Sequence, residues 1–482
     1  MVSTISSSQT LTETALSDLR AQLRGDMLVS GEDGYDAART LWNAMIDRQP
    51  AVIAHCTGVA DILDALSFAR DHDLPVAVRA GGHNVAGTAL CDGGLAIDLT
   101  RMKGIRVDPA ARRARVAGGV TWGELDREAQ VFGLATTGGV IPATGVTGLT
   151  LGGGLGWLMR KHGLSCDNLL SADVVTADGR LISASADENP ELFWGLRGGG
   201  GNFGVVTSFL FRLHPVTNVI GGPTFWTLDQ APEVMRWYRD FIATAPEELN
   251  GFFAVLRIPP VPPFPEAMHG MQVCAIFWCY TGPAADADRV FAPIRAMGPP
   301  LIDAVTEMPY PMLQNMFDPL VPSGLQWYWK SHFVKELPDE AIDVHMAFAE
   351  SIPTQKSTMH MYPINGAVHN VDRHDTAFSY RDMTWALVIV GIDPDPANAG
   401  TITSWARDYW QALRPFAAEG AYVNMLMDEE DDQRVRTAYR DNHETLQAVK
   451  QRYDPQNLFR INWNIRPTAL AINPARPSTL PL

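Results

Sequence analysis

The residues best suited to chemistry lie in one short segment, 79–84 (Arg-Ala-Gly-Gly-His-Asn), which directly follows an apolar stretch at 76–78. Adjacent glycines let the backbone approach a bulky ligand and direct its N–H groups at an anion. The imidazole of His83 is a nucleophile at the end of this turn, where such a ligand has to lie. A second glycine-rich stretch, 145–156, has the same character. Two such loops predict a large phosphate-bearing cofactor, and His83 is a candidate for a covalent bond to it.

Each of these features also has a simpler interpretation. A loop histidine commonly only hydrogen-bonds to the backbone, and His83 taken alone fits that role. A glycine-rich stretch is often a flexible linker, but apolar residues such as Val146 and Leu149 alternate with the glycines of 145–156, unlike a solvated linker. We therefore expect a buried turn that lines the ligand. Asp98 and the histidines lack metal-ligand spacing, so we expect no metal site.

A third glycine run matches the G-x-G-x-x-G pattern at 199–204. In a dinucleotide-binding fold this pattern follows a strand and opens a helix. Here it follows a helix-like segment at 191–196 and precedes a strand-like segment at 205–213. The reversed order argues against that fold, and no G-x-x-x-x-G-K-[ST] loop is present. The four glycines at 198–201 still predict close approach of the backbone to a ligand.

Composition limits the class of protein. The 482 residues exceed the roughly 250–300 that one hydrophobic core supports, and the net charge of −16 argues against nucleic acid or an anionic membrane as a partner. Five cysteines without CxxC spacing favour reduced thiols. Residues 1–14 lack the basic and apolar regions of a signal peptide, and no apolar run reaches about 20 residues. We therefore expect a soluble cytoplasmic protein.

The patterning divides the chain into four parts. Residues 1–45 form an N-terminal helical segment, and 46–215 contain many strands with interspersed helices, beginning with a strand–helix–strand pattern. Residues 216–450 contain fewer glycine loops and more Trp, Met, Phe and Pro, and their strands and helices predict an antiparallel sheet with helices on one face. Residues 451–482 form a C-terminal segment.

Taken together, the motifs resemble the FAD-linked oxidases of the vanillyl-alcohol oxidase type, specifically the berberine-bridge-enzyme-like branch. The resemblance extends from about residue 51 to 467, and its most specific parts are 78–84, 145–156, 163–168, 193–207 and 457–465. It implies an α+β, two-domain FAD-binding PCMH-type fold with an antiparallel-sheet substrate domain. In such a fold 46–215 would bind FAD, 216–450 would cover the flavin ring, and the C-terminal segment would return to the FAD domain.

The resemblance also implies which residues contact FAD. His83 would be bonded to the 8α carbon of the flavin. Ile141 stands where doubly linked members have a cysteine, so a single histidyl link and a small or medium substrate are expected. The full set of implied FAD-binding residues is Arg79, Ala80, Gly81, Gly82, His83, Asn84, Gly139, Thr144, Gly145, Gly148, Leu149, Gly152, Gly153, Gly154, Gly156, Asn168, Gly204, Val205, Val206, Asn462 and Asn464.

Catalysis in this family requires hydride transfer from a substrate carbon to flavin N5, with a base to accept a proton. Tyr422 and Asn424 are expected on one face of a strand, and they resemble the family position that often carries a catalytic tyrosine. His360 and Tyr362 also share a strand face and are the second choice. Ordinary strand packing is the alternative for all four. The glutamate base of alkaloid-cyclising members has no counterpart near 385–388, which disfavours C–C bond formation.

The expected function is FAD-dependent oxidation of an alcohol, hydroxylated metabolite, sugar or amine, with reoxidation by O₂ to give H₂O₂. Thr144, a small residue, stands where oxidases of the family often have one. The alternatives are a dehydrogenase that passes electrons to a quinone or protein, and a flavin-binding homologue without turnover. The sequence leaves the substrate and the oligomeric state open.

Overall fold

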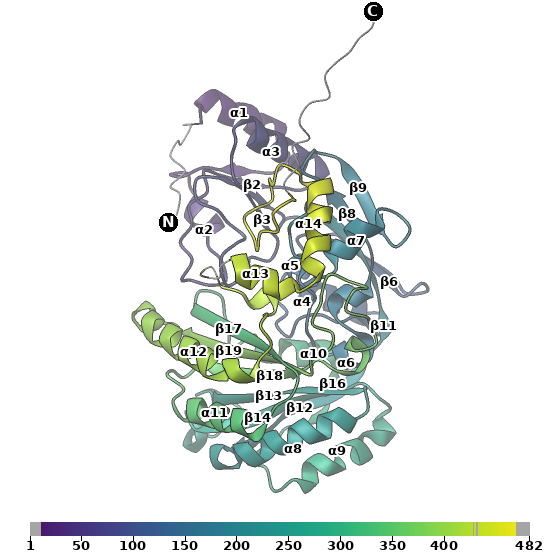
Figure 1. The fold of residues 1–482 in the computed structure, drawn as a ribbon, viewed down its shortest axis with the longest axis vertical. Helices are drawn as coiled ribbons and strands as arrows, with labels where there is room; N and C mark the ends of the chain where they lie inside the picture. The colour runs from purple at the N-terminus through teal and green to yellow at the C-terminus, as the bar shows by residue number, and fades with distance from the viewer. Residues whose placement is uncertain (1–10, 428, 430–431, 469–482) are drawn as a thin grey trace, which may run out of the picture.

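The computed structural model describes residues 11–427, 429 and 432–468. It has two parts, an upper and a lower one in Figure 1, and the chain returns at its end to the part where it began. The upper part is built on two small sheets, and the lower part on one large antiparallel sheet. The α+β two-domain fold expected from the sequence is therefore confirmed.

The first sheet of the upper domain has four strands in the order β1-β2-β4-β3. Strands β2, β3 and β4 are parallel, and β1 is antiparallel to β2. The helix α3 connects β2 to β3, and four of its buried residues, at positions 62, 65, 66 and 69, recur at the spacing of one helical face. The elements are α1 (Glu13–Gln22), β1 (Met27–Leu28), α2 (Tyr35–Ala38), β2 (Val52–His55), α3 (Val59–Asp71), β3 (Val76–Arg79) and β4 (Leu95–Asp98).

The second sheet is antiparallel, with five strands in the order β5-β6-β10-β8-β9. Helix α4 begins at the predicted capping box, where the Glu124 carboxylate accepts hydrogen bonds from the backbone N–H of Thr121 at 2.8 Å and from its hydroxyl at 3.0 Å. The elements of this part are β5 (Ile105–Asp108), β6 (Arg113–Ala117), α4 (Trp122–Gln130), β7 (Leu134–Ala135), α5 (Val146–Leu151), α6 (Met159–His162), β8 (Leu169–Val175), β9 (Leu181–Ser185), α7 (Pro190–Leu196), β10 (Val205–Arg212) and β11 (His214–Pro215).

The order of elements around the third glycine run is as predicted. The run follows α7 and leads directly into β10, so no helix begins there. Gly198, Gly200 and Gly204 have φ values of 123°, 75° and 152°, which residues with a Cβ rarely adopt. The glycines therefore shape a turn between a helix and a strand, unlike the glycines of a dinucleotide-binding fingerprint.

The lower domain contains an eight-stranded sheet with the order β15-β12-β14-β13-β18-β19-β17, and β16 also pairs with β12. All its pairings are antiparallel, as predicted. Its strands are β12 (Asn218–Thr227), β13 (Leu249–Arg257), β14 (Gln272–Tyr280), β15 (Ile302–Asp303), β16 (Thr306–Pro309), β17 (Gln326–Val334), β18 (Thr358–Pro363) and β19 (Trp385–Asp393).

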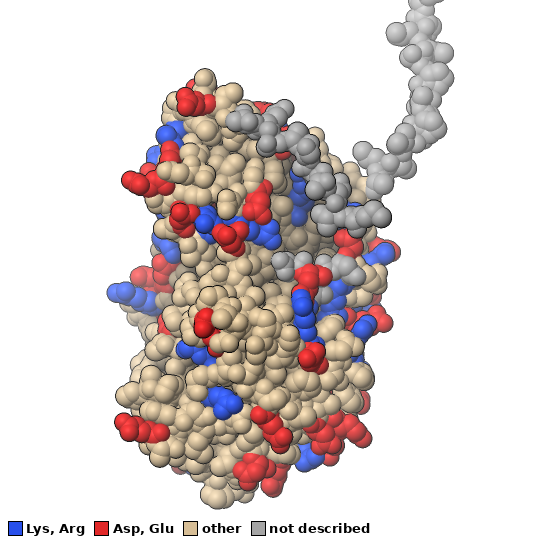
Figure 2. Space-filling model, turned by 90° about the vertical axis from the view of Figure 1, so that its left-hand side faces the viewer, with Lys and Arg blue, Asp and Glu red and all other residues tan. Residues whose placement is uncertain are grey.

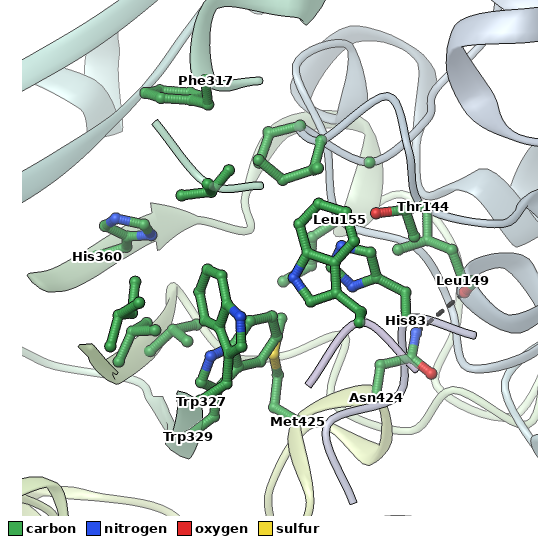
Figure 3. A pocket seen from close by; sticks show the side chains of 18 of the residues that line it. His83, Thr144, Leu149, Leu155, Phe317, Trp327, Trp329, His360, Asn424 and Met425 are labelled. Carbon is green, nitrogen blue, oxygen red and sulfur yellow. Dashed lines mark hydrogen bonds between the residues drawn. The ribbon is translucent and has the colours of Figure 1, made fainter. Parts of the chain in front are cut away.

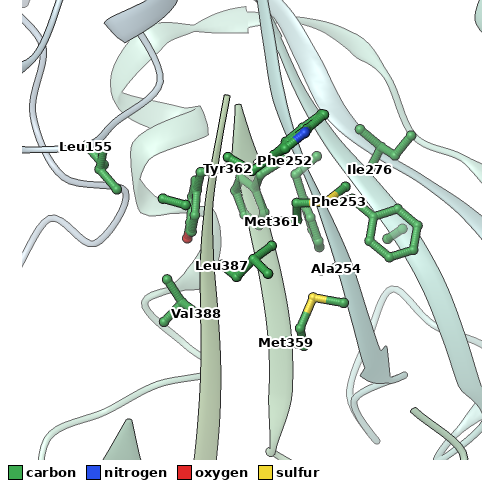
Figure 4. Close-up of a cluster of buried hydrophobic side chains, with 14 of the residues drawn as sticks. Leu155, Phe252, Phe253, Ala254, Ile276, Met359, Met361, Tyr362, Leu387 and Val388 are labelled. Atoms are coloured by element: carbon green, nitrogen blue, oxygen red, sulfur yellow. The ribbon is translucent and has the colours of Figure 1, made fainter. Parts of the chain in front are cut away.

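Helices cover the face of this sheet that points away from the upper domain (Figure 1). They are α8 (Ala231–Thr244), α9 (Ala287–Ala296), α11 (Asp339–Glu350) and α12 (Ala399–Leu413), while the short α10 (Tyr310–Gln314) packs against α4. Side chains of the central strands alternate between the two faces. Phe253, Met361 and Leu387 lie in register on one face, and their neighbours Phe252, Tyr362 and Val388 lie on the other (Figure 4).

The last part of the chain packs into the upper domain. Helices α13 (Asp432–Tyr439) and α14 (Asn442–Tyr453) lie beside it in Figure 1, and residues 421, 423 and 426 already belong to its hydrophobic core. The return therefore begins well before the predicted boundary at residue 450, because apolar side chains from 421 onward fill that core. Lys450 and Asp454 form an ion pair of 2.7 Å that is fully buried at this junction.

Two local predictions are corrected by the structure. The stretch 145–156, expected as a turn, contains the one-and-a-half-turn helix α5, whose apolar residues Val146 and Leu151 pack in the core. Tyr422 and Asn424, expected on a strand, lie at the start of and within a 3₁₀ turn, Val423–Met425. A four-residue alternation of apolar and polar types does not distinguish a strand from such a turn, so tertiary packing decides between them.

Three further properties concern the surface charge, the cysteines and the character of the helices. Acidic and basic side chains are interspersed over the face shown in Figure 2. The five cysteines, all within the described residues, are buried and form no disulfide. Among the helices of the described ranges, none combines the length and apolar character needed to cross a bilayer.

Candidate functional site

A cavity of about 1320 Å³ lies between the two domains. The upper domain contributes both glycine loops, and the lower domain contributes the sheet face that turns toward them. Figure 3 shows His83, Thr144 and Leu149 on one side of this space and His360 and Phe317 on the other. Within the described part of the chain, no group of three or more His, Cys, Asp or Glu side chains is arranged to hold a metal ion.

The two glycine loops touch each other at Gly81 and Gly145. A Cβ on Gly81 would lie 2.4 Å from the backbone N of Gly145, and a Cβ on Gly145 would lie 2.5 Å from the N of Gly81. Both distances are far below van der Waals contact, so these two glycines are required by contact between the loops. The loops are consequently held side by side at one edge of the cavity.

Gly148 is different, because a Cβ there would meet no atom within 4 Å and the residue lines the cavity. A ligand can therefore approach the α5 backbone closely at this point. By contrast, Cβ atoms on Gly152, Gly153 and Gly154 would overlap the side chains of Asn424, Phe378 and Ser165. These later glycines serve packing between segments of the chain.

The predicted FAD-binding residues fall into two groups, those that line the cavity and those that do not. Those that line the cavity are Ala80, Gly81, Gly82, His83, Asn84, Gly139, Thr144, Gly145, Gly148, Leu149, Gly204, Val206 and Asn462. Those outside its lining are Arg79, Gly152, Gly153, Gly154, Gly156, Asn168, Val205 and Asn464.

Some of the residues outside the lining support it from behind. The Arg79 guanidinium donates to the carbonyl of Ala38 and lies 3.6 Å from the buried carboxylate of Asp98. The Asn168 amide donates to the carbonyls of His162 and Leu164, each at 2.9 Å. Polar side chains that satisfy buried backbone groups in this way fix the shape of the loops around the cavity.

His83 lies in a dry, aromatic environment. Its ring stacks on Trp42, with centroids 4.3 Å apart, and Trp329 is 6.4 Å away. Burial lowers the pKa of His83 to about 4, so the imidazole is neutral at pH 7. Its Nε2 is buried and has no hydrogen-bond partner among the described protein atoms. A neutral imidazole with an unused nitrogen is a competent nucleophile, and it requires a partner from outside the chain.

The opposite wall is one face of the large sheet. Every second residue of three central strands lines the cavity, for example Phe252 and Ala254 on β13, His360 and Tyr362 on β18, and Val388 on β19. This alternation follows directly from the two-residue period of a strand. Two residues of this wall, His360 and Tyr362, were identified from the sequence. The tryptophans at 327 and 329 were missed, although their own spacing of two places them on one face of β17.

The four predicted catalytic residues all line the cavity, in two separate pairs. On β18, the Nδ1 of His360 lies 3.1 Å from the hydroxyl of Tyr362. Across the cavity, the hydroxyl oxygen of Tyr422 accepts hydrogen bonds from the Gly154 N–H at 2.9 Å and from the Asn424 amide at 2.8 Å. That amide also donates to the carbonyl of Leu149, drawn as a dashed line in Figure 3.

The electrostatics of the two pairs differ. Burial raises the pKa of Tyr422 to about 12, and the two donors on its oxygen only partly oppose this. Tyr422 therefore keeps its proton at pH 7 and can donate it in a hydrogen bond to a ligand. Burial lowers the pKa of His360 to about 4, so this imidazole is neutral at pH 7 and keeps a lone pair that can accept a hydrogen bond or a proton, although the same burial disfavours the charged ring.

The site fits FAD on observations independent of any resemblance. The cavity joins two glycine loops to a sheet face, the His83 Nε2 has no partner among the residues that the structure describes, and Gly148 leaves the α5 backbone open. Asn462 uses its amide N–H₂ on the carbonyls of Gly201 and Phe459, and its buried Oδ1 is left without a partner. Fold and site together define a two-domain flavoprotein with a substrate chamber between its domains.

Comparison with known proteins places the chain in a family. Residues 50–185 match the FAD binding domain model, and residues 421–466 match the model for the C-terminal segment called berberine and berberine like. The chain belongs to the FAD-linked oxidoreductases with this C-terminal segment. It is an FAD-linked oxidoreductase enzyme, and the family resemblance inferred from the sequence is confirmed.

Individual relatives cover almost the whole chain. An FAD-linked oxidoreductase of Dictyostelium discoideum is 31% identical, over 88% of this chain and 91% of the relative. The (R)-6-hydroxynicotine oxidase of Paenarthrobacter nicotinovorans is 30% identical, over 92% of this chain and 97% of the relative. The crystal structure of 6-hydroxy-D-nicotine oxidase from Arthrobacter nicotinovorans superimposes with a TM-score of 0.82 at 26% identity, covering 92% of this chain and 98% of that one.

Proposed function

We propose that the protein is an oxidase with FAD attached covalently through His83, which oxidises a small or medium organic alcohol or amine and reduces O₂ to H₂O₂. The observation that carries the proposal is the neutral, buried His83 with an unpartnered nitrogen beside two touching glycine loops. Ile141 lines the cavity where a second, cysteinyl link would need a thiol, which supports a single attachment. That a 30%-identical relative is named an oxidase supports oxygen as the acceptor.

When bound, FAD would supply the two-electron redox chemistry that links oxidation of the substrate to reduction of oxygen. The chain supplies attachment, orientation and proton transfer. Residues 80–84 and 144–149 would hold the cofactor along the contact between the loops, and the Asn462 Oδ1 would accept a hydrogen bond from it. The substrate loses two electrons and two protons in total, and O₂ takes up the equivalent amount as H₂O₂.

The substrate proton is assigned to His360. Its ring is neutral at pH 7, lines the cavity and is hydrogen-bonded to Tyr362. Tyr422, first choice from the sequence, is a weaker candidate for the base because burial raises its pKa to about 12 and the described hydrogen bonds to its oxygen come from neutral groups. Tyr422 is instead assigned to hydrogen-bond donation toward the bound ligand.

The attachment is tested by His83→Ala. The wild-type protein should remain yellow after acid precipitation and show the mass of the chain plus FAD, whereas His83→Ala should release FAD on denaturation. His360→Gln is the matched control, because it alters another neutral cavity histidine and should leave the flavin attached. Retention of flavin by His83→Ala would refute the assignment.

The reaction is tested by stopped-flow reduction with a panel of alcohols and amines, followed by exposure to air. An oxidase should reoxidise rapidly and form one H₂O₂ per substrate. A reduced flavin that persists in air and is reoxidised by a quinone would identify a dehydrogenase instead. Failure of every compound to bleach the flavin would favour a flavin-binding protein without turnover. Loss of reduction in His360→Gln, with reduction retained in Tyr422→Phe, would support the assigned base.

A further inference from the structure

The wall of the cavity that faces the glycine loops is lined mainly by apolar side chains. It is formed by aromatic and aliphatic side chains of the large sheet and the segment beside it, including Phe252, Phe317, Trp327, Trp329 and Val388. Phe252 is the centre of this group, with ring centroids 4.7 Å from Tyr362, 5.2 Å from His360 and 6.0 Å from Phe317. The reactive pair on β18 is therefore surrounded by rings.

Charged side chains on the described lining are few, and each of them forms hydrogen bonds within the chain. Arg257 donates to the carbonyls of Gly270 and Ile352, and Lys356 donates to the carbonyl of Leu320 at 2.6 Å. The Asp393 carboxylate accepts from the backbone N–H of residue 395 and from the amide of residue 398. These groups are committed to the chain itself, so they are poorly placed to exchange their bonds for a ligand.

A neutral polar group of the lining is likewise hydrogen-bonded within the chain. The hydroxyl of Thr358, two residues before His360 on β18, donates to the carbonyl of Val255 at 2.8 Å. The hydrogen-bonding side chains that this wall offers to a substrate are thus few: His360, Tyr362 and the indole N–H groups of Trp327 and Trp329, which are buried without a partner among the described atoms and can only donate. A molecule with many hydroxyl groups would lose its water contacts here and gain few in return.

We propose that the substrate is a flat, largely apolar molecule, an aromatic ring system that carries a single oxidisable C–OH or C–NH group, and that it is not a polyol. The identity of the reacting group rests on the proposed function. The shape and polarity of the substrate are inferred from the cavity wall alone. The heteroatom lies beside His360 and Tyr362, and the ring packs among Phe252, Phe317 and the tryptophans of β17, where apolar area is removed from water.

The test uses the flavin-loaded protein and small-molecule probes of known structure. Benzyl alcohol, 1-naphthalenemethanol and N-methylbenzylamine are compared with glucose, xylobiose and glycerol. Binding is read from saturable changes in the flavin absorption spectrum, and turnover is read from bleaching without oxygen. We expect the aromatic probes to bind at least about tenfold more tightly than the sugars, with the naphthyl compound tighter than the benzyl one.

Phe317→Ala provides the matched variant, since Phe317 is half-buried in a short 3₁₀ turn on the cavity wall. It should weaken naphthyl binding by about tenfold without changing flavin content. Met312→Ala, 63% exposed on the nearby α10, should change neither.

The outcomes separate this inference from the proposed function. A sugar that binds as tightly as the aromatic probes, or that bleaches the flavin faster, overturns the inference and leaves the oxidase proposal standing. Aromatic probes that bind through Phe317 but never bleach the flavin support the inference and count against the oxidase proposal. Equal binding of the naphthyl probe to wild type and Phe317→Ala, or no spectral change with any aromatic probe, overturns the inference.

Discussion

Two glycines only three residues apart, Gly145 and Gly148, should respond oppositely to the same substitution. Gly145 has φ −66° and ψ 134°, values that alanine adopts freely, so any cost of Gly145→Ala is steric. Its new methyl group would lie 2.5 Å from the backbone N and 2.8 Å from the Cα of Gly81. Separating the loops should cost about 1–3 kcal/mol, the usual range for overpacking.

Gly148 lies within α5, and a methyl group there meets no protein atom within 4 Å. Replacing glycine by alanine inside a helix stabilises it by about 1 kcal/mol. Gly148→Ala should therefore make the flavin-free protein equally or more stable. Because the methyl group projects into the cavity, the same variant should bind FAD less well.

Thermal unfolding of both variants in the His83→Ala background, from which flavin can be removed, tests this reasoning. Gly145→Ala should lower the melting temperature with and without FAD. Gly148→Ala should hold or raise it without FAD and reduce the stabilisation that added FAD provides. If Gly148→Ala destabilises the flavin-free protein as much as Gly145→Ala does, the distinction between loop-contact and ligand-facing glycines is refuted.

Three further results are expected. Asp454→Asn should cost about 3–5 kcal/mol in denaturant unfolding, because Lys450 would remain buried without a counter-charge. Asp167→Asn should cost a similar amount and loosen the contact between the domains, since both carboxylate oxygens of Asp167 lie 2.6 Å from Arg381 nitrogens. Stability should fall as the pH drops from about 6.5 toward 4, because burial lowers the pKa of six histidines to about 3 or 4 and the unfolded chain then binds more protons.

One control serves both ion-pair variants, and a second variant tests the pH dependence. Asp432→Asn breaks an ion pair with Arg466 whose side chains are 82% and 68% exposed, and it should change stability by less than about 1 kcal/mol. A loss as large as that of Asp454→Asn would contradict the role given to burial. Asp126, whose pKa burial raises to about 7, acts in the opposite direction on pH dependence, so Asp126→Asn should make the acid-side loss of stability steeper. A stability that is flat between pH 6.5 and 4 would contradict the account of the histidines.

Local features were predictable because they depend on a few consecutive residues. The capping box of Thr121 and Glu124, the helix 59–71 and the order of helix, glycine run and strand around 198–205 all follow from short-range sterics and hydrogen bonding. The alternation of His360 and Tyr362 likewise placed both side chains on one face of β18. The motifs were specific enough in combination to predict the flavoprotein fold.

Contacts between distant segments were not predictable in the same way. Gly81 and Gly145 were predicted to contact a ligand, and both line the cavity, but nothing in the sequence indicated that the two loops also lie against each other at these residues. Tyr422 was placed on a strand because its neighbours alternate in type, whereas its hydroxyl docks on the Gly154 N–H from a 3₁₀ turn. No local pattern encodes which loop meets which.

By itself, then, the sequence determined many of the helices and strands, the glycine loops and the candidate nucleophile His83, since each rests on backbone geometry or chemistry within a few residues. The tertiary structure alone decided that Trp42, from the N-terminal segment, stacks on that histidine, and that strands far apart in sequence form one apolar wall opposite it. The physical reason is that burial, and with it the pKa of His83 and His360, depends on every segment that excludes water from the site.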